Sequence, residues 1–299
     1  MSSLDGRVAI ITGAGRGIGR EHALLFAAEG AAVVVNDLGG QTDGLGSSAG
    51  PAQDVVSEIE AAGGRAVTSV SDVATAEGAD ELVTTALDAF GRLDVLVNNA
   101  GILRDRTIIN MIDDDWDQSI RVNLRGHFMP LRAAARHWRE QAKAGAEVDA
   151  SIINTSSESG VFANAGQSNY AAAKSAVATL TEVASKELVR YGARVNAILP
   201  RARTRLTEDL VPAAKTDRFD KWEAANVSPF VAHLALAGGK INGQVFLVGG
   251  GLVQRVAPWT LDPAWLLEAD GRWSTAQLAA AVDAAGLPDN AGRLTGNIR

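Results

Sequence analysis

The strongest constraint on the fold is a glycine-rich segment near the start of the chain. Residues 7–12 (Arg-Val-Ala-Ile-Ile-Thr) are a β-branched apolar run, which is typical of a strand buried on both faces. Gly13–Gly19 follows at once, and an amphipathic segment then runs to Ala28. A second apolar run, residues 31–37, ends in the carboxylate of Asp37. This order predicts a dinucleotide-binding unit whose first helix directs its N-terminus at a pyrophosphate. Taken alone, the glycine loop is also compatible with a plain tight turn.

Strand-like and helix-like segments alternate through most of the 299 residues. Alternation of this kind predicts an α/β fold, a single doubly wound Rossmann-type parallel sheet of seven strands with helices on both faces. No repeat or linker divides the chain. We therefore expect one domain over residues 1–252 and a C-terminal extension, 253–299, that packs on the same domain or on a neighbouring subunit. Five further strands are expected at residues 65–70, 95–98, 151–155, 194–198 and 244–248.

Composition excludes several classes of function. The formal net charge of −7 argues against nucleic-acid binding and against an anionic membrane surface. The chain has no Cys, and its four His residues lack metal-ligand spacing, so we expect no metal site. The N-terminus runs into a strand without a signal peptide, and no apolar run is long enough to span a bilayer. A cytoplasmic enzyme or binding protein fits these observations.

Tyr170 and Lys174 form the most reactive pattern in the sequence. They are four residues apart with three Ala between them, so on a helix both side chains lie on one face. An ammonium beside a phenol favours the phenolate, and bringing a Tyr pKa from ~10 to about 7 takes roughly 4 kcal/mol. The pair therefore predicts a general acid/base. An ordinary surface helix is the alternative when the pair is taken alone.

The nucleotide end of the chain carries a choice between two cofactors. Asp37 can accept hydrogen bonds from both ribose hydroxyls of an adenosine and would repel a 2′-phosphate, so NAD is favoured over NADP. Arg16 acts in the opposite direction, because a cation in the glycine loop can meet that phosphate. Asp72 could accept a hydrogen bond from the adenine amino group, or it could instead cap the helix ahead of Thr75.

The segment Asn98–Gly101 (Asn-Asn-Ala-Gly) ends an expected strand at the carboxyl edge of the sheet, where ligands bind. A simple turn would explain this segment equally well. Together with Thr12–Gly19, Asn123, Ser157 and the Tyr170–Lys174 pair, it resembles the pattern of the classical short-chain dehydrogenases/reductases. Ser157 stands thirteen residues before Tyr170, as that family requires. The likeness covers residues 5–252.

The resemblance implies four catalytic roles. Tyr170 exchanges a proton with the substrate oxygen, Lys174 lowers the Tyr pKa and holds the nicotinamide ribose, and Ser157 hydrogen-bonds the same substrate oxygen. Asn123 anchors a water that links Lys174 to solvent. Ser156 is expected to point to the other side of the chain. The cofactor-binding residues are expected to be Gly13, Gly15, Arg16, Gly17, Ile18, Gly19, Asp37, Asp72, Val73, Asn99, Ala100, Gly101, Tyr170, Lys174, Pro200 and Thr204.

A narrower likeness concerns the substrate. Residues 33–40, 98–106 and 166–170 are similar to the (3R)-hydroxyacyl-CoA dehydrogenase part of peroxisomal multifunctional β-oxidation enzymes. This implies an NAD-dependent oxidoreductase that interconverts a 3-hydroxyacyl-CoA and a 3-oxoacyl-CoA, with an acyl-CoA thioester as its partner molecule. Three alternatives remain open: a hydroxysteroid dehydrogenase, a 3-oxoacyl-carrier-protein reductase, and a nucleotide-sensing protein without catalysis. Arg16 favours the reductase, whereas Asp37 argues against it.

Two surface features suggest partners. The Tyr170 helix carries more apolar residues than one stripe needs, and the resemblance implies a homodimer or homotetramer built on such helices. The alternative is that all of them pack on the sheet. Arg201, Arg203 and Arg205 stand at alternate positions of an extended segment and would point to one side. They predict either a site for the phosphates of coenzyme A or ordinary ion pairs with Asp and Glu.

Overall fold

The computed structural model describes residues 3–46, 48–205, 219–257 and 265–286, together with positions 207, 211 and 261. The chain divides into two compact units, Met1–Val256 and Ala257–Arg299. In the second unit, helix α9 (Thr275–Ala285) begins with a capping box, in which Ser274 and Gln277 exchange hydrogen bonds. Of the predicted C-terminal extension, residues 258–260, 262–264 and 287–299 lie outside the described residues.

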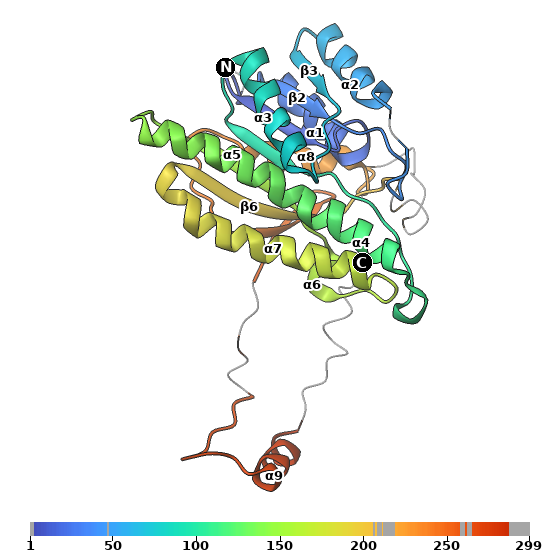
Figure 1. Cartoon of the computed structure of the whole chain (residues 1–299), viewed down its shortest axis with the longest axis vertical. Coiled ribbons are helices and arrows are strands. Elements are labelled where there is room, and N and C mark those ends of the chain that lie inside the picture. Colours follow the sequence, from blue (N-terminus) through green and yellow to red (C-terminus); the bar gives the residue numbers. More distant parts are fainter. Residues whose placement is uncertain are drawn as a thin grey trace. The chain divides into compact units, whose positions relative to one another are not determined.

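The first unit is built on one sheet with the strand order β3-β2-β1-β4-β5-β6-β7-β8 (Figure 1). Strands β1 to β7 are parallel, as predicted, and β8 pairs with β7 in the antiparallel direction. The strands are β1 (Val8–Thr12), β2 (Ala32–Asn36), β3 (Arg65–Ser69), β4 (Val95–Asn98), β5 (Ala150–Thr155), β6 (Ala193–Pro200), β7 (Val245–Gly249) and β8 (Leu252–Val256).

The eighth strand is the one difference from the predicted sheet. Its residues, Leu-Val-Gln-Arg-Val, are mostly exposed, so the strand lacks the apolar pattern of a buried one. Gly249, Gly250 and Gly251 all have positive φ and turn the chain back on β7. Only glycine takes these angles readily, so the three consecutive glycines were the signal for this hairpin.

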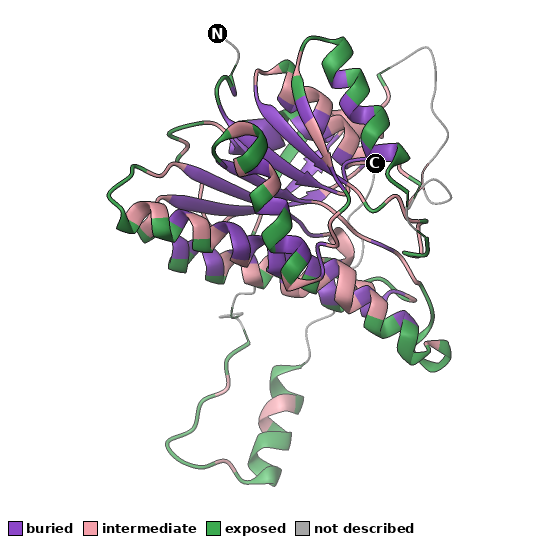
Figure 2. Ribbon diagram, turned by 45° about the horizontal axis from the view of Figure 1, so that its top comes forward, coloured by how far each residue is buried: buried purple, intermediate pink, exposed green. Residues whose placement is uncertain are grey.

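Helices cover both faces of the sheet (Figure 2). Helices α1, α2 and α8 pack on one face, and α3, α5 and α7 pack on the other. Within the part of the chain that the structure describes, the helices of the first unit are α1 (Gly17–Ala28), α2 (Gly50–Ala61), α3 (Ala76–Phe90), α4 (Asp113–Ile120), α5 (Gly126–Lys143), α6 (Glu158–Phe162), α7 (Ser168–Leu188) and α8 (Ser228–Leu234).

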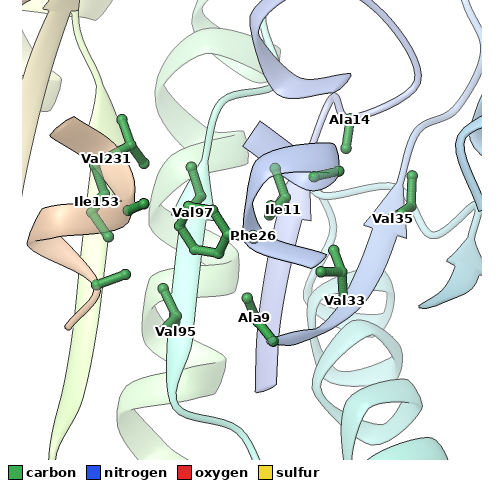
Figure 3. Close-up of a cluster of buried hydrophobic side chains, with 14 of the residues drawn as sticks. Ala9, Ile11, Ala14, Phe26, Val33, Val35, Val95, Val97, Ile153 and Val231 are labelled. Atoms are coloured by element: carbon green, nitrogen blue, oxygen red, sulfur yellow. The ribbon is translucent and has the colours of Figure 1, made fainter. Parts of the chain in front are cut away.

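The strands feed both cores, because successive side chains point to opposite faces. On β1, Ala9 and Ile11 join the core under α1, which is centred on Phe26 (Figure 3), whereas Val8 and Ile10 join the core under α3. All four residues are at most 2% exposed. Complete burial of one such side chain is worth roughly 1.5–3 kcal/mol, so the two cores fix the sheet between its helices.

The strand order places a crevice between β1 and β4. Ile11 pairs with Val35 on one side and with Val97 on the other, so the carboxyl ends of three strands meet at one edge. The connections from β1 and β4 leave to opposite sides at this point, and open α/β sheets bind ligands there. The glycine loop and the Asn98–Gly101 segment both leave the sheet at this edge.

Candidate active site

Tyr170 and Lys174 lie in the first two turns of α7 and share one face, as their spacing predicts. The side-chain nitrogen of Lys174, Nζ, lies 5.7 Å from the centre of the Tyr170 ring. It donates a hydrogen bond of 2.8 Å to the carbonyl of Thr155, the last residue of β5. The end of the central strand therefore fixes the lysine next to the phenol.

The two serines after β5 point to different partners. Ser156 donates from Oγ to the carbonyl of Lys174 at 2.6 Å and is 1% exposed, so it fastens α7 to the strand. Ser157 caps the N-terminus of α6, where its Oγ accepts the N–H of Ser159. Its hydroxyl also hydrogen-bonds Tyr170. Ser157 is thus the serine beside the phenol.

In the protein without ligand, burial is the main influence on the pKa values of Tyr170 and Lys174. Burial raises the pKa of Tyr170 to about 12, although its hydrogen bond with Ser157 lowers that pKa, and the charge of Asp105 raises it further. Burial lowers the pKa of Lys174 to about 7. In the protein alone, burial therefore outweighs the hydrogen bond from Ser157, and the pKa of Tyr170 lies above its ordinary value.

Asn123 is fully buried in a short π-helix, η2 (Arg121–Arg125), which lies between α4 and α5. Its Oδ1 accepts the N–H of Ile102 at 3.2 Å, and its Nδ2 donates to the carbonyl of Ile102 at 3.0 Å. The amide thus fixes the loop after β4. Short π-helices of this kind are often found at functional sites.

The glycine loop approaches its neighbours so closely that side chains would not fit. Gly13 has φ +63°, and a Cβ atom there would lie 2.7 Å from Cα of Ala100. A Cβ on Gly15 would lie 2.8 Å from Oδ2 of Asp37. Helix α1 begins directly after this loop without a side-chain cap, so its first N–H groups remain open to an anion.

Asp37 is oriented by the backbone on both sides. Its Oδ2 accepts the N–H of Gly15 at 2.8 Å, and its Oδ1 accepts the N–H of Gly39 at 2.6 Å. Arg16 turns away from the carboxylate and donates to the carbonyl of Gly40 at 3.2 Å. The carboxylate therefore stands at the end of β2 in a fixed direction and keeps lone pairs for further donors.

Asp72 follows β3, the strand next to β2, and its carboxylate makes two contacts. Its Oδ1 accepts the N–H of Ala74 at 2.9 Å, and its Oδ2 pairs with Arg121. The cap of α3 is Thr75, whose Oγ1 accepts the N–H of Gly78. Asp72 is therefore not the helix cap, and it lines the cleft with Val73.

The end of β6 brings Pro200 to the cleft, and the segment after it brings Thr204. Thr204 approaches the glycine loop, since a Cβ on Gly17 would lie 3.4 Å from its methyl group. Arg201 and Arg203 do not form the predicted cationic strip. Arg201 makes a two-point ion pair with Glu158 (2.7 and 2.6 Å), and Arg203 pairs with Asp220 at 2.6 Å. These contacts support the ion-pair alternative, whereas Arg205 is exposed at the rim of the cleft.

One cavity of ≈ 360 Å³ joins the nucleotide residues to the catalytic ones. Three of the predicted site residues, Gly15, Gly19 and Asn123, do not line this cavity. The predicted residues that line it are Gly13, Arg16, Gly17, Ile18, Asp37, Asp72, Val73, Asn99, Ala100, Gly101, Ser157, Tyr170, Lys174, Pro200 and Thr204.

Several lining residues were not predicted. Gln167, Ser159 and Asn164 stand beside Tyr170 in a hydrogen-bonded group, in which Gln167 also donates to Asp105 at 2.7 Å. Residues 38–46 of the glycine-rich segment after Asp37 contribute a further wall. Its five glycines were visible in the sequence, but they indicate only a loop. Among the described residues, no helix is long and apolar enough to cross a membrane, and no group of acidic or His side chains could hold a metal ion.

The cleft fits a dinucleotide. It offers an uncapped helix N-terminus for phosphates, a pre-oriented carboxylate at the end of β2 for a ribose, and a Tyr–Lys–Ser group farther along the same edge. The chain matches the model of the short chain dehydrogenase family over residues 7–214. It belongs to this family, and it is an oxidoreductase that acts on CH–OH groups with an NAD(P) cofactor.

Relatives of the chain narrow the comparison. It is 43% identical to the hydroxyacyl-CoA dehydrogenase ChsB1 of Mycobacterium tuberculosis, over 94% of this chain and 89% of that protein. It is also 43% identical to the peroxisomal multifunctional enzyme type 2 of Mus musculus, of which it covers 33%. A crystal structure of a short chain dehydrogenase from Mycobacterium avium superposes with a TM-score of 0.85 at 48% identity, covering 95% of both chains.

Proposed function

We propose that this protein oxidises a 3-hydroxyacyl-CoA to the 3-oxoacyl-CoA, or catalyses the reverse reduction, with NAD as its cofactor. The observation that carries the proposal is the single cleft in which Asp37 and the Tyr170–Lys174–Ser157 group face one cavity. The relative named for hydroxyacyl-CoA is matched over most of both chains, and this supports the substrate class.

The chain's own residues handle the proton and the position of the substrate. Oxidation removes a hydride from the carbinol carbon and a proton from its oxygen, and bound NAD supplies the hydride acceptor. Tyr170 takes the proton at its phenolic oxygen, and Ser157 donates a hydrogen bond to the same substrate oxygen. Lys174 stabilises the phenolate by its charge, which must overcome the burial that raises the pKa of Tyr170 to about 12.

The preference for NAD rests on Asp37. Both of its oxygens are held by backbone N–H groups, so the carboxylate cannot turn away from a 2′-phosphate without losing them. The Arg16 guanidinium is engaged by the carbonyl of Gly40. We therefore expect Asp37→Ala to weaken NAD binding and to narrow the difference in kcat/KM between NAD and NADP.

One assay tests the function. Formation of NADH is followed with hydroxyacyl-CoAs of several lengths, with the same acyl groups on acyl carrier protein, and with hydroxysteroids. The proposal predicts the highest kcat/KM for a hydroxyacyl-CoA. A higher kcat/KM for a steroid would instead indicate a hydroxysteroid dehydrogenase, and a higher kcat/KM for a carrier-protein thioester would indicate a carrier-protein reductase. A wild-type preference for NADPH in the reduction would refute the role of Asp37.

A further inference from the structure

The glycine-rich loop after β2, residues 38–50, of which the structure describes all but position 47, folds back on itself. The N–H of Ser48 donates to the carbonyl of Leu38 at 2.8 Å and closes its base. Inside the loop, Gln41 donates to Leu45 at 2.8 Å and Gly44 donates to Gln41 at 3.0 Å. Five glycines in this loop make its ordering entropically costly. Contacts to other segments therefore decide how well it is held.

The loop forms one wall of the nucleotide end of the cleft. Leu38, Gly40, Gln41, Thr42, Gly44 and Gly46 line the same cavity as Gly13, Asp37 and Asp72. A Cβ on Gly44 would lie 3.2 Å from Cδ1 of Ile102, so the tip of the loop packs on the segment after β4. A nucleotide that meets Asp37 and Asp72 would therefore lie under this loop.

Arg104 ties the tip of the loop to the body of the protein. Its Nε donates to the carbonyl of Asp43 at 2.8 Å, next to a backbone bond of 3.1 Å from Leu103 to Thr42. The other end of its guanidinium pairs with Asp114 at 2.5 Å and lies 3.6 Å from Asp115, both in the first turn of α4. The Arg104 side chain is only 11% exposed, so these contacts are poorly screened by water.

The same residue also reaches the catalytic helix. The carbonyl of Arg104 accepts a hydrogen bond of 2.9 Å from Nδ2 of Asn169, the neighbour of Tyr170. Asn169 is fully buried and donates as well to the carbonyl of Asp115 at 2.9 Å. Arg104 therefore links three segments: its side chain joins the loop to α4, and its backbone contacts the start of α7.

We propose that Arg104 is a positioning residue that holds loop 38–50 over the nucleotide end of the cleft and thereby slows release of the bound nucleotide. The identity of that nucleotide rests on the proposed function. A rigid fork is needed to reach a carbonyl and a carboxylate at once, so Lys is a poor substitute at this position. Loss of the tie frees the loop, and the nucleotide then leaves faster.

The test uses Arg104→Ala and Arg104→Lys in the full chain. Hydrogen exchange of peptides from residues 38–50 measures how well the loop is held. Stopped-flow displacement of NADH and fluorescence titration measure its release rate and Kd. Arg104→Ala should speed loop exchange and accelerate NADH release about tenfold, because a charge-assisted hydrogen bond is lost. Arg104→Lys should fall between this variant and wild type.

Arg106→Ala is the matched control. Arg106 lies in the same connection and pairs with Asp115 at 3.4 Å. Its side chain is 61% exposed, and it makes no hydrogen bond or ion pair to the described part of the loop. It should leave loop exchange and NADH release unchanged. The proposal fails if Arg104→Ala leaves loop exchange as in wild type, or if it speeds exchange without changing release or Kd.

Two further outcomes separate this inference from the proposed function. If wild type binds NADPH and not NADH, the proposed cofactor is wrong. The same release and Kd measurements, made with NADPH, then test whether Arg104 holds the loop. If Arg104→Ala does not fold by circular dichroism, Arg104→Lys decides, and wild-type loop exchange and release in that variant overturn the proposal.

Discussion

At the scale of one residue, the burial of Lys174 next to Tyr170 lowers the stability of the fold. The residue is 2% exposed, and burial lowers its pKa from 10.5 to about 7. Thr155 gives it one carbonyl partner, and that carbonyl also accepts Nε2–H of His127 at 3.2 Å. No acidic side chain stands among these partners, so the buried charge is poorly compensated.

Lys174→Met should therefore stabilise the fold in a pH-dependent way. Between about pH 7 and 10.5 the unfolded lysine binds more protons than the folded one, so the wild-type free energy of unfolding rises with pH across this window. Below pH 7 the full cost of the buried charge is present. Urea unfolding should show the variant more stable at pH 6, and this advantage should be smaller at pH 9 by about 2–3 kcal/mol, because one pKa unit corresponds to about 1.4 kcal/mol. A constant difference would contradict this account.

Tyr170→Phe isolates the phenolic hydroxyl. Loss of a general acid/base costs about 10²–10⁴ in rate, while the ring itself stays in place. We expect turnover to fall by this factor and the Kd for NADH to stay close to that of wild type. Tyr191 is the only other tyrosine, so Tyr191→Phe is the control and should keep full activity. A Tyr170→Phe variant that retains more than about a tenth of the rate, an effect under roughly 1.4 kcal/mol, would remove Tyr170 from this role.

At the scale of elements, α5 is anchored to the sheet by Trp138. This side chain is 1% exposed, and its Nε1 donates to the carbonyl of Leu93 at 2.8 Å, just before β4. Trp138→Phe should lower the free energy of unfolding by about 2–3 kcal/mol, because it leaves a buried carbonyl unpaired and a small void. Leu93 lies before the amino end of β4, whereas the cleft lies at the carboxyl end of this strand. The Kd for NADH should therefore not change. Trp116→Phe, at an exposed site on α4, should cost under about 0.5 kcal/mol in urea unfolding.

Elements with strong patterns could be predicted from the sequence. The seven parallel strands and the Tyr170–Lys174 face follow from local rules, because buried strands and helical spacing leave a direct mark on residue types. The π-helix at Asn123 and the fold of loop 38–50 could not be predicted. Both are set by partners distant in sequence, Ile102 for the amide and Arg104 for the loop.

At the scale of the molecule, we expect self-association. Helix α7 buries Val177 and Leu188 against the body, but Val183 is 46% exposed, and Phe128 on α5 is 38% exposed. Apolar side chains left on this helical face favour a homodimer or homotetramer. Light scattering at micromolar concentration should give a multiple of the chain mass for wild type and a lower mass for Val183→Asp. A monomeric wild type would contradict the prediction.

The antiparallel strand β8 also determines where the backbone departs from the catalytic unit. Gly249, at the carboxyl end of β7, pairs with Leu252, and Val245, at its amino end, pairs with Val256. The polypeptide therefore leaves this unit at the sheet edge opposite the one that carries the cleft.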